Sequence, residues 1–171
     1  MLSFIYQLNF MADLKKENYS KILIILTILI LLSAFSIQYI FGYQPCNLCL
    51  IERVPYILAL IILLINLKSK KNDLFFSILL MLIFSFSILI SLYHFGIEQG
   101  LIEESSVCAS KNIELLTKDE ILKSLQELRI SCKDVTFRVF GLSLTAYNII
   151  MSILMFLISF KIYLINNGNK K

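Results

Sequence analysis

Two of the chain's four cysteines lie in a short polar stretch, Gln44 to Arg53, between two long apolar runs. Cys46 and Cys49 have C-x-x-C spacing, and a disulfide across so small a loop adds little stability, because the stabilisation grows with loop length. If a helix begins near Cys46, both sulfurs lie in its first turn, where free backbone N–H groups and the helix dipole favour a thiolate. A thiolate is the species that attacks disulfides, so we predict redox chemistry at this pair.

The other two cysteines, Cys108 and Cys132, admit a simpler interpretation. Four cysteines in an oxidising compartment would ordinarily form two structural disulfides, which suits Cys108 and Cys132 better than it suits the C-x-x-C pair. A four-cysteine zinc site would need a second C-x-x-C pair, which the sequence does not contain. We therefore expect redox chemistry without a metal ion, and structural disulfides are the main alternative.

The elements that position these cysteines are membrane helices. The chain is 58% hydrophobic with a mean hydropathy of +0.79, far above that of a soluble domain. Four apolar stretches, at about 22–41, 48–67, 74–93 and 140–165, reach the roughly 20 residues that cross a bilayer. The first of these stretches is longer than the apolar core of a signal peptide, and no small-residue cleavage site follows it, so we retain it as a membrane helix. The sequence predicts an all-α polytopic membrane protein, a four-transmembrane-helix bundle.

Charge sets the expected orientation, because Lys and Arg near span ends tend to remain cytoplasmic. With four spans, three basic clusters fall on one side: Lys15, Lys16 and Lys21; Lys68, Lys70 and Lys71; and Lys161, Lys170 and Lys171. We expect residues 1–21 and 166–171 to be cytoplasmic, and the loops 42–47 and 94–139 to be periplasmic. All four cysteines then lie at or beyond the outer surface, and the net charge of +4 is explained without a nucleic-acid partner.

Arg53 is expected just inside the membrane edge. A helix that began only at Pro55 would span about 20 Å, too short to cross, so we expect it to begin earlier and to be kinked at Pro55. Arg53 then shares a helix face with Cys49 and lies about 6 Å deeper. An ionisable residue there is a functional candidate, although it could snorkel or pair with Glu52. Electrons taken from thiols need an acceptor, and a membrane quinone, stabilised by Arg53 as it gains charge, fits this position.

Several stretches together resemble the DsbB family of disulfide bond formation proteins. These are Pro45-Cys46-x-Leu48-Cys49-x-x-Glu52-Arg53 after the first span, a second cysteine pair in the long outer loop, the stretch from Tyr93 to Gly100, and Phe140-Gly141-Leu142-Ser143-Leu144. The resemblance covers about residues 22–165. It implies a bacterial inner-membrane four-helix bundle that takes electrons from a periplasmic DsbA-like thioredoxin-fold oxidase and passes them to ubiquinone or menaquinone.

The resemblance also implies roles for the individual cysteines. Cys108 receives the attack of the reduced partner, and the released Cys132 attacks Cys46. Cys49 is then left as a thiolate that delivers electrons to the quinone beside Arg53, and the pairs Cys46/Cys49 and Cys108/Cys132 are restored. His94, the only histidine, lies near the expected level of Cys49. It is expected either to donate a proton or hydrogen bond to the quinone or to be an ordinary interfacial residue.

The outer loop also predicts local structure. Residues 99–112 are polar and leave Cys108 able to enter a partner's groove. Thr117 to Glu120 form a capping-box pattern, followed by an apolar stripe of Ile121, Leu122, Leu125 and Leu128, so we expect a short amphipathic helix on the membrane surface or on the mouth of the bundle. Asn148, inside the fourth span, is expected to join helices rather than bind a ligand.

Three alternative functions remain open at this stage. The chain could be a relative in the same family that serves a single periplasmic substrate. It could be an oxidoreductase like vitamin K epoxide reductase, which also uses a helix bundle, C-x-x-C and quinone, although the PCxLCxxER pattern argues against it. It could also be a non-enzymatic membrane subunit with two structural disulfides.

Overall fold

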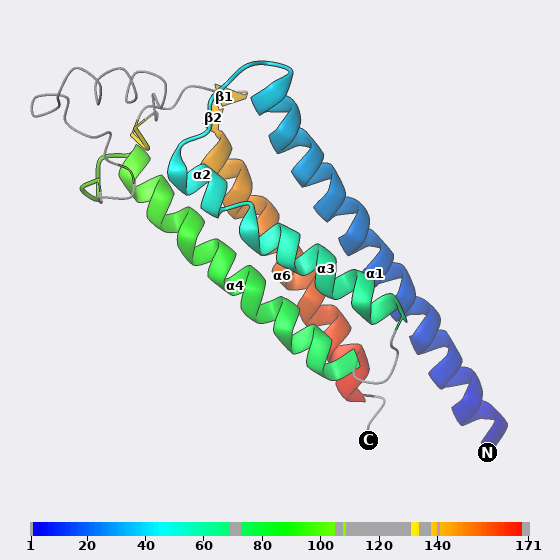
Figure 1. The fold of residues 1–171 in the computed structure, drawn as a ribbon. Helices are drawn as coiled ribbons and strands as arrows, with labels where there is room; N and C mark the ends of the chain where they lie inside the picture. Colours follow the sequence, from blue (N-terminus) through cyan, green and yellow to red (C-terminus); the bar gives the residue numbers. More distant parts are fainter. Residues whose placement is uncertain are drawn as a thin grey trace, which may run out of the picture.

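The computed structural model describes residues 2–68, 73–104, 108, 131–133, 138–139 and 141–168, with side chains described from residue 18 onward. These residues form a bundle of long helices with one very small sheet (Figure 1). In chain order the elements are α1 Leu2–Tyr39, α2 Asn47–Ile51, α3 Val54–Lys68, α4 Asp73–Glu98, β1 Arg138–Val139, β2 Leu142–Ser143 and α6 Leu144–Gly168.

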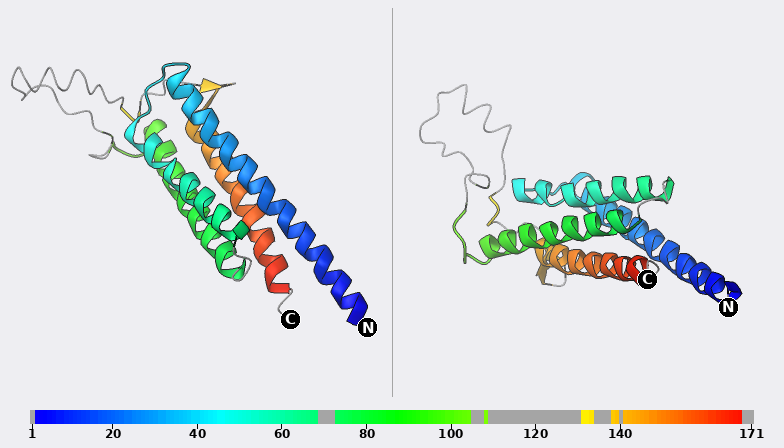
Figure 2. Two further views of the ribbon diagram at one scale, coloured as in Figure 1. Left: turned by 45° about the vertical axis from the view of Figure 1, so that its right-hand side comes forward. Right: turned by 90° about the horizontal axis from the view of Figure 1, so that it is seen from below.

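Four segments are long and apolar enough to cross a membrane: Asn18–Tyr39, Asn47–Lys68, Asp73–Glu98 and Leu144–Gly168. Only 17% to 33% of their most apolar windows is buried inside the protein, so most of their surface is available to lipid. Figures 1 and 2 show the start of α1 and the end of α6 at one end of the bundle, with α2 and the small sheet at the other. The predicted all-α, four-span architecture is confirmed.

Small polar residues let the helices approach closely, as is common in membrane proteins. On the α4–α6 interface, the buried hydroxyls of Ser87 and Ser152 lie 2.9 Å apart. Asn148 of α6 donates to Ser91 of α4 at 2.7 Å and accepts from the Tyr56 hydroxyl of α3 at 2.5 Å. The interpretation of Asn148 as a residue that joins helices is therefore confirmed.

The second span is broken rather than kinked. It begins before Pro55, as expected, but α2 ends at Ile51 and α3 begins at Val54, with a turn at Glu52 and Arg53. Proline cannot donate a hydrogen bond to the carbonyl of Ile51, and it disfavours helical backbone in the residue before it.

The third span extends past its expected end at residue 93, so His94 and Glu98 are helical. The helix stops where Gly100 adopts a φ of +71°, and the amide of Leu101 donates to the Gly96 carbonyl at 2.9 Å. The chain folds back so closely that a Cβ on Gly96 would lie 2.7 Å from Ile102 Cδ1. The extension places two ionisable side chains inside the bundle mouth.

The remaining differences from the expected structure lie in the outer loop and at the start of the chain. The fourth helix begins at Leu144, because residues 138–139 and 142–143 form an antiparallel hairpin that turns at Gly141, where φ is +83°. The predicted amphipathic helix at residues 117–128 lies outside the described residues. The first helix begins at Leu2, within the segment expected to be cytoplasmic.

Candidate thiol–disulfide site

The C-x-x-C pair is built by the start of α2. Cys46 caps this helix with extended backbone (φ −69°, ψ 170°), and its sulfur accepts a hydrogen bond from the Cys49 amide at 3.2 Å. This contact is the N-cap interaction, made by sulfur in place of the usual oxygen. Both cysteines are thiols, and their sulfurs lie 2.7 Å apart. Little movement is needed to join them in a disulfide, which supports the expected redox role of the spacing.

Cys46 lies in surroundings that favour its thiolate. Its sulfur is hydrogen-bonded to the Cys49 thiol and lies 3.5 Å from Nε2 of His94. The hydrogen bond with Cys49, and then the hydrogen bond and charge of His94, lower the pKa of Cys46 from its ordinary 9.0 to about 5, against burial, which raises it. At neutral pH Cys46 is therefore mainly a thiolate, which is the nucleophilic form of cysteine.

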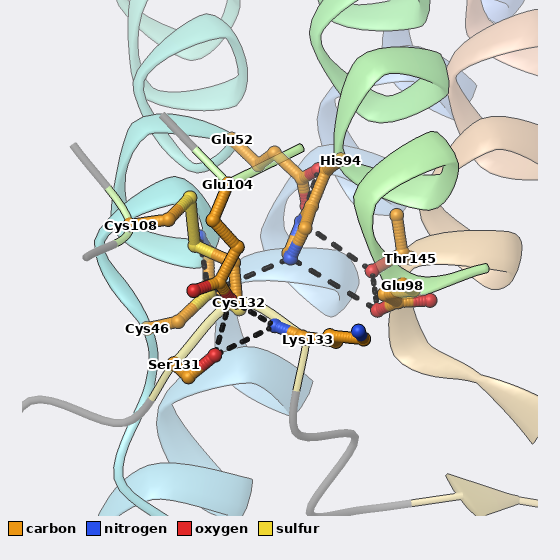
Figure 3. Close-up of a disulfide and its surroundings, with 11 residues drawn as sticks. Cys46, Glu52, His94, Glu98, Glu104, Cys108, Ser131, Cys132, Lys133 and Thr145 are labelled. Carbon is orange, nitrogen blue, oxygen red and sulfur yellow. Dashed lines mark hydrogen bonds and ion pairs between the residues drawn. A yellow bond between two sulfur atoms is a disulfide. The ribbon is translucent and has the colours of Figure 1, made fainter. Parts of the chain in front are cut away.

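His94 is held between two buried carboxyl groups (Figure 3). Its Nδ1 lies 3.0 Å from Glu52 Oε1, and its Nε2 lies 4.0 Å from Glu98 Oε1. Thr145, at the start of α6, donates its hydroxyl to Glu98 and also lies 3.4 Å from His94 Nδ1. The imidazole therefore links the α2–α3 break, α4 and α6 to the sulfur of Cys46.

The second cysteine pair is a disulfide between Cys108 and Cys132, with a Cα–Cα distance of 5.3 Å. Both residues are buried, and they form one apolar cluster with Cys46, Leu48 and Ile97. The two cysteine pairs are thus packed together, although they are far apart in the sequence.

The flank of Cys132 is fixed by Glu104, as Figure 3 shows. The carboxylate accepts a hydrogen bond from the Ser131 hydroxyl and another from the Lys133 amide at 2.9 Å. These bonds hold the residues on either side of Cys132. Two separate parts of the outer loop are therefore joined to each other by the disulfide and by one exposed carboxylate.

Arg53 points toward α1. Its Nη1 donates to Gln38 Oε1 at 2.6 Å, its Nη2 lies 3.5 Å from the Ala34 carbonyl, and the guanidinium lies 5.2 Å from the centre of the Phe35 ring. The alternative that Arg53 pairs with Glu52 is wrong for this structure, because the Glu52 carboxylate faces His94.

A cavity of about 210 Å³ lies beside these groups. Arg53, Cys49, His94 and Cys132 all line it, so the structure brings together the first cysteine pair, one cysteine of the second pair and both expected quinone-binding residues. Its other walls are mostly apolar side chains of α1 and α6, including Ile30, Leu31, Ile37 and Met151.

The cavity has mostly apolar walls with a few fixed polar groups, which is the composition of a site for a flat apolar ring that carries polar oxygens. Arg53 supplies donors, and Glu98 supplies a buried carboxyl whose Oε2 has no partner among the described residues. An orphaned buried polar atom on the cavity wall is suited to a polar ligand atom.

Sequence reasoning missed three residues of this site. Glu98 was placed in the outer loop, although its spacing of four from His94 would have put both on one face of a longer helix. Glu52 was recognised as part of the motif, but its contact with His94 was not. Thr145 gave no signal, because a threonine at the start of a helix is ordinarily a simple cap.

A bundle of four membrane helices that holds a C-x-x-C dithiol against a second, disulfide-bonded pair is the arrangement of a membrane thiol–disulfide oxidoreductase. The comparisons with known proteins agree. The family model described as disulfide bond formation protein DsbB matches residues 17–162, and the chain belongs to the DsbB family. The recognition from the sequence motif is therefore confirmed.

One curated relative is an uncharacterized protein, RP370, from Rickettsia prowazekii (strain Madrid E). It is 31% identical over 146 residues, which cover 82% of this chain and 85% of the relative. No solved structure matches the chain significantly. The family establishes a membrane disulfide oxidoreductase, while the partner and the electron acceptor must be argued from the site.

Proposed function

We propose that this protein reoxidises a periplasmic DsbA-like thioredoxin-fold oxidase and passes the electrons through its two cysteine pairs to a membrane quinone. The observation that carries the proposal is the buried cluster of Cys46, Cys108 and Cys132, which adjoins a cavity lined by Cys49 and Arg53. An electron path from an outer disulfide to an acceptor in the membrane requires the two cysteine pairs to be in contact and the first pair to lie beside the acceptor.

The exchange steps begin at the second pair. The partner's thiolate attacks Cys108, which forms a mixed disulfide and releases Cys132 as a thiolate. Cys132 attacks Cys46 of the oxidised first pair, so a bond forms between the two pairs and Cys49 leaves as a thiolate. The partner's second thiol closes its own disulfide and releases Cys108.

Cys108 then displaces Cys46 from Cys132. The second pair is reformed, and the first pair holds the two electrons of the partner as a dithiol. A low pKa makes Cys46 the better leaving group in this last step, since thiols of low pKa leave faster.

A bound quinone would accept two electrons and two protons and thereby restore the Cys46–Cys49 disulfide. Arg53 would donate to its carbonyl oxygens, Glu98 would accept a hydrogen bond from a hydroxyl of the reduced form, and the apolar side chains of α1 and α6 would enclose its ring. The fit to the cavity supports a quinone but does not distinguish ubiquinone from menaquinone.

We also propose the bacterial inner membrane as the location, with both termini cytoplasmic and the cysteines periplasmic. The positive-inside rule supports this orientation, because the three basic clusters at 15–21, 68–71 and 161–171 fall at the span ends opposite those that flank the cysteines in the sequence. A periplasmic location would supply reduced thioredoxin-fold partners to Cys108.

The test uses purified protein in detergent with a reduced DsbA-type partner and a soluble quinone, and follows quinone absorbance. Wild type should consume quinone only when the partner is present, and Cys49→Ser and Cys108→Ser should each abolish consumption. Leu89→Ala, at an exposed position of α4 that does not line the cavity, is the matched control and should retain activity. Persistent activity in either cysteine variant would refute the proposed route.

A further inference from the structure

The reduced first pair and His94 together have the composition of a zinc site. The sulfurs of Cys46 and Cys49 and one nitrogen of His94 all lie within 4.8 Å of one another. Zinc is commonly bound by two thiolates and one imidazole, with a fourth position left to water or substrate. The sequence alone does not predict this site, because only the fold brings His94 of α4 beside the start of α2.

The distances fit tetrahedral zinc after a small adjustment. With Zn–S near 2.3 Å and Zn–N near 2.05 Å, tetrahedral angles place the sulfur and nitrogen ligands about 3.5 Å apart and two sulfurs about 3.8 Å apart. Cys46 Sγ and His94 Nε2 are already 3.5 Å apart. The two sulfurs are 2.7 Å apart, so they would need to separate by about 1 Å, which rotation of the Cys49 side chain can supply.

The surroundings complete the site. A metal-binding imidazole usually donates its other ring N–H to a carboxylate, which fixes the tautomer and raises the basicity of the ligand. Glu52 Oε1 lies 3.0 Å from His94 Nδ1 and can accept that hydrogen bond, which leaves Nε2 directed at the thiols. The cavity adjoins the same three ligands and offers space for a fourth ligand. Two thiolates also neutralise the charge of a divalent ion in this buried position.

We propose that the reduced Cys46–Cys49 pair binds Zn²⁺ together with His94, and that the bound ion blocks reoxidation of the pair. Binding is gated by redox state, because a Cys46–Cys49 disulfide has lost both thiolate ligands. Zinc holds both sulfurs in bonds to the metal, so neither can attack or leave. Binding requires only reduced thiols and the described geometry, while the block of reoxidation rests on the proposed function.

The binding test uses full-length protein in detergent with Cys108→Ser and Cys132→Ser, so that reduction exposes only the first pair. The protein is reduced with a phosphine, which is then removed, and titrated with Zn²⁺ against a chromogenic chelator. Co²⁺ serves as a spectroscopic substitute that reports tetrahedral geometry and thiolate ligation. We expect one equivalent bound by the reduced protein and none by the oxidised protein.

Variants separate this site from adventitious thiol binding. Cys49→Ser should abolish binding, His94→Ala should weaken it at least tenfold, and Glu52→Gln should weaken it about 10-fold or more. Glu103→Gln, which changes an exposed carboxylate outside the site, is the matched control and should have no effect. Helix content measured by circular dichroism verifies the fold of each variant. Undiminished binding in folded His94→Ala, or no binding by the reduced parent, would overturn the site.

Inhibition is measured separately on the wild-type chain. Micromolar Zn²⁺ should stop quinone consumption after the first pair is reduced, and a chelator should restore it. If zinc binds but quinone is not consumed even without zinc, the proposed electron acceptor is wrong and the metal site stands. If quinone is consumed at the same rate with zinc bound, the proposed block is wrong.

Discussion

Cys46 is expected to be ionised at neutral pH in the reduced protein, and this can be measured directly. A pKa of about 5 gives roughly 100 thiolates per thiol at pH 7, whereas the ordinary 9.0 would give roughly one per 100. The largest single contribution is the hydrogen bond with Cys49, and His94 adds a hydrogen bond and a charge. Cys49→Ala and His94→Ala should therefore each raise the pKa of Cys46.

The assay is a pH titration of Cβ-labelled cysteine by NMR, with Cys108 and Cys132 replaced by serine and Cys46→Ser used to assign the signal. Since folding lowers the pKa, the thiolate stabilises the reduced fold fully above about pH 9, and this stabilisation is lost as the pH falls through about 5. A Cys46 transition near pH 9 in the parent protein, or an unchanged transition in both variants, would refute the electrostatic account of the site.

Three further perturbations follow from the structure. Tyr56→Phe removes the hydrogen bonds of the Tyr56 hydroxyl with Asn148 and Ser152. The free energy of unfolding, measured by thermal unfolding in detergent, should fall by roughly 1 kcal/mol. An unchanged free energy of unfolding would mean that these bonds are not made. Gly96→Val should displace Ile102, whose side chain packs against Gly96, and lower the unfolding temperature. An unchanged unfolding temperature would contradict this close approach. Arg53→Gln should raise the quinone KM several-fold while the thiol titration is unaltered, and an unaltered KM would remove Arg53 from the quinone site.

The bundle could be predicted from the sequence because each membrane span is a local property. A run of about 20 apolar residues crosses a bilayer whatever its neighbours are. The ends of the spans were less predictable, since they depend on tertiary contacts. The third helix continues to Glu98 because Gly96 and Ile102 pack together and Gly100 provides the stop. This extension moved His94 and Glu98 from an expected loop into the bundle mouth.

The site was predictable in its residue types but not in its pairings. The C-x-x-C spacing and the position of Arg53 pointed to the right stretch. Glu52, in the turn between α2 and α3, contacts His94 of α4, and Arg53 of the same turn contacts Gln38 of α1. Both contacts join residues that are far apart in the sequence, so the sequence pattern alone does not contain them. The zinc-like arrangement was invisible in the sequence for the same reason.

The central claim is that the two cysteine pairs exchange electrons with each other, and a variant with only one cysteine from each pair tests it most directly. Cys49→Ser with Cys108→Ser leaves Cys46 and Cys132, which share one buried cluster. Mild oxidation of this variant in native membranes, followed by proteolysis and mass spectrometry, should find a nearly complete Cys46–Cys132 disulfide. The matched variant that keeps Cys49 and Cys108 should give much less. Two thiols that remain unjoined in the folded Cys46/Cys132 variant would contradict the relay between the pairs.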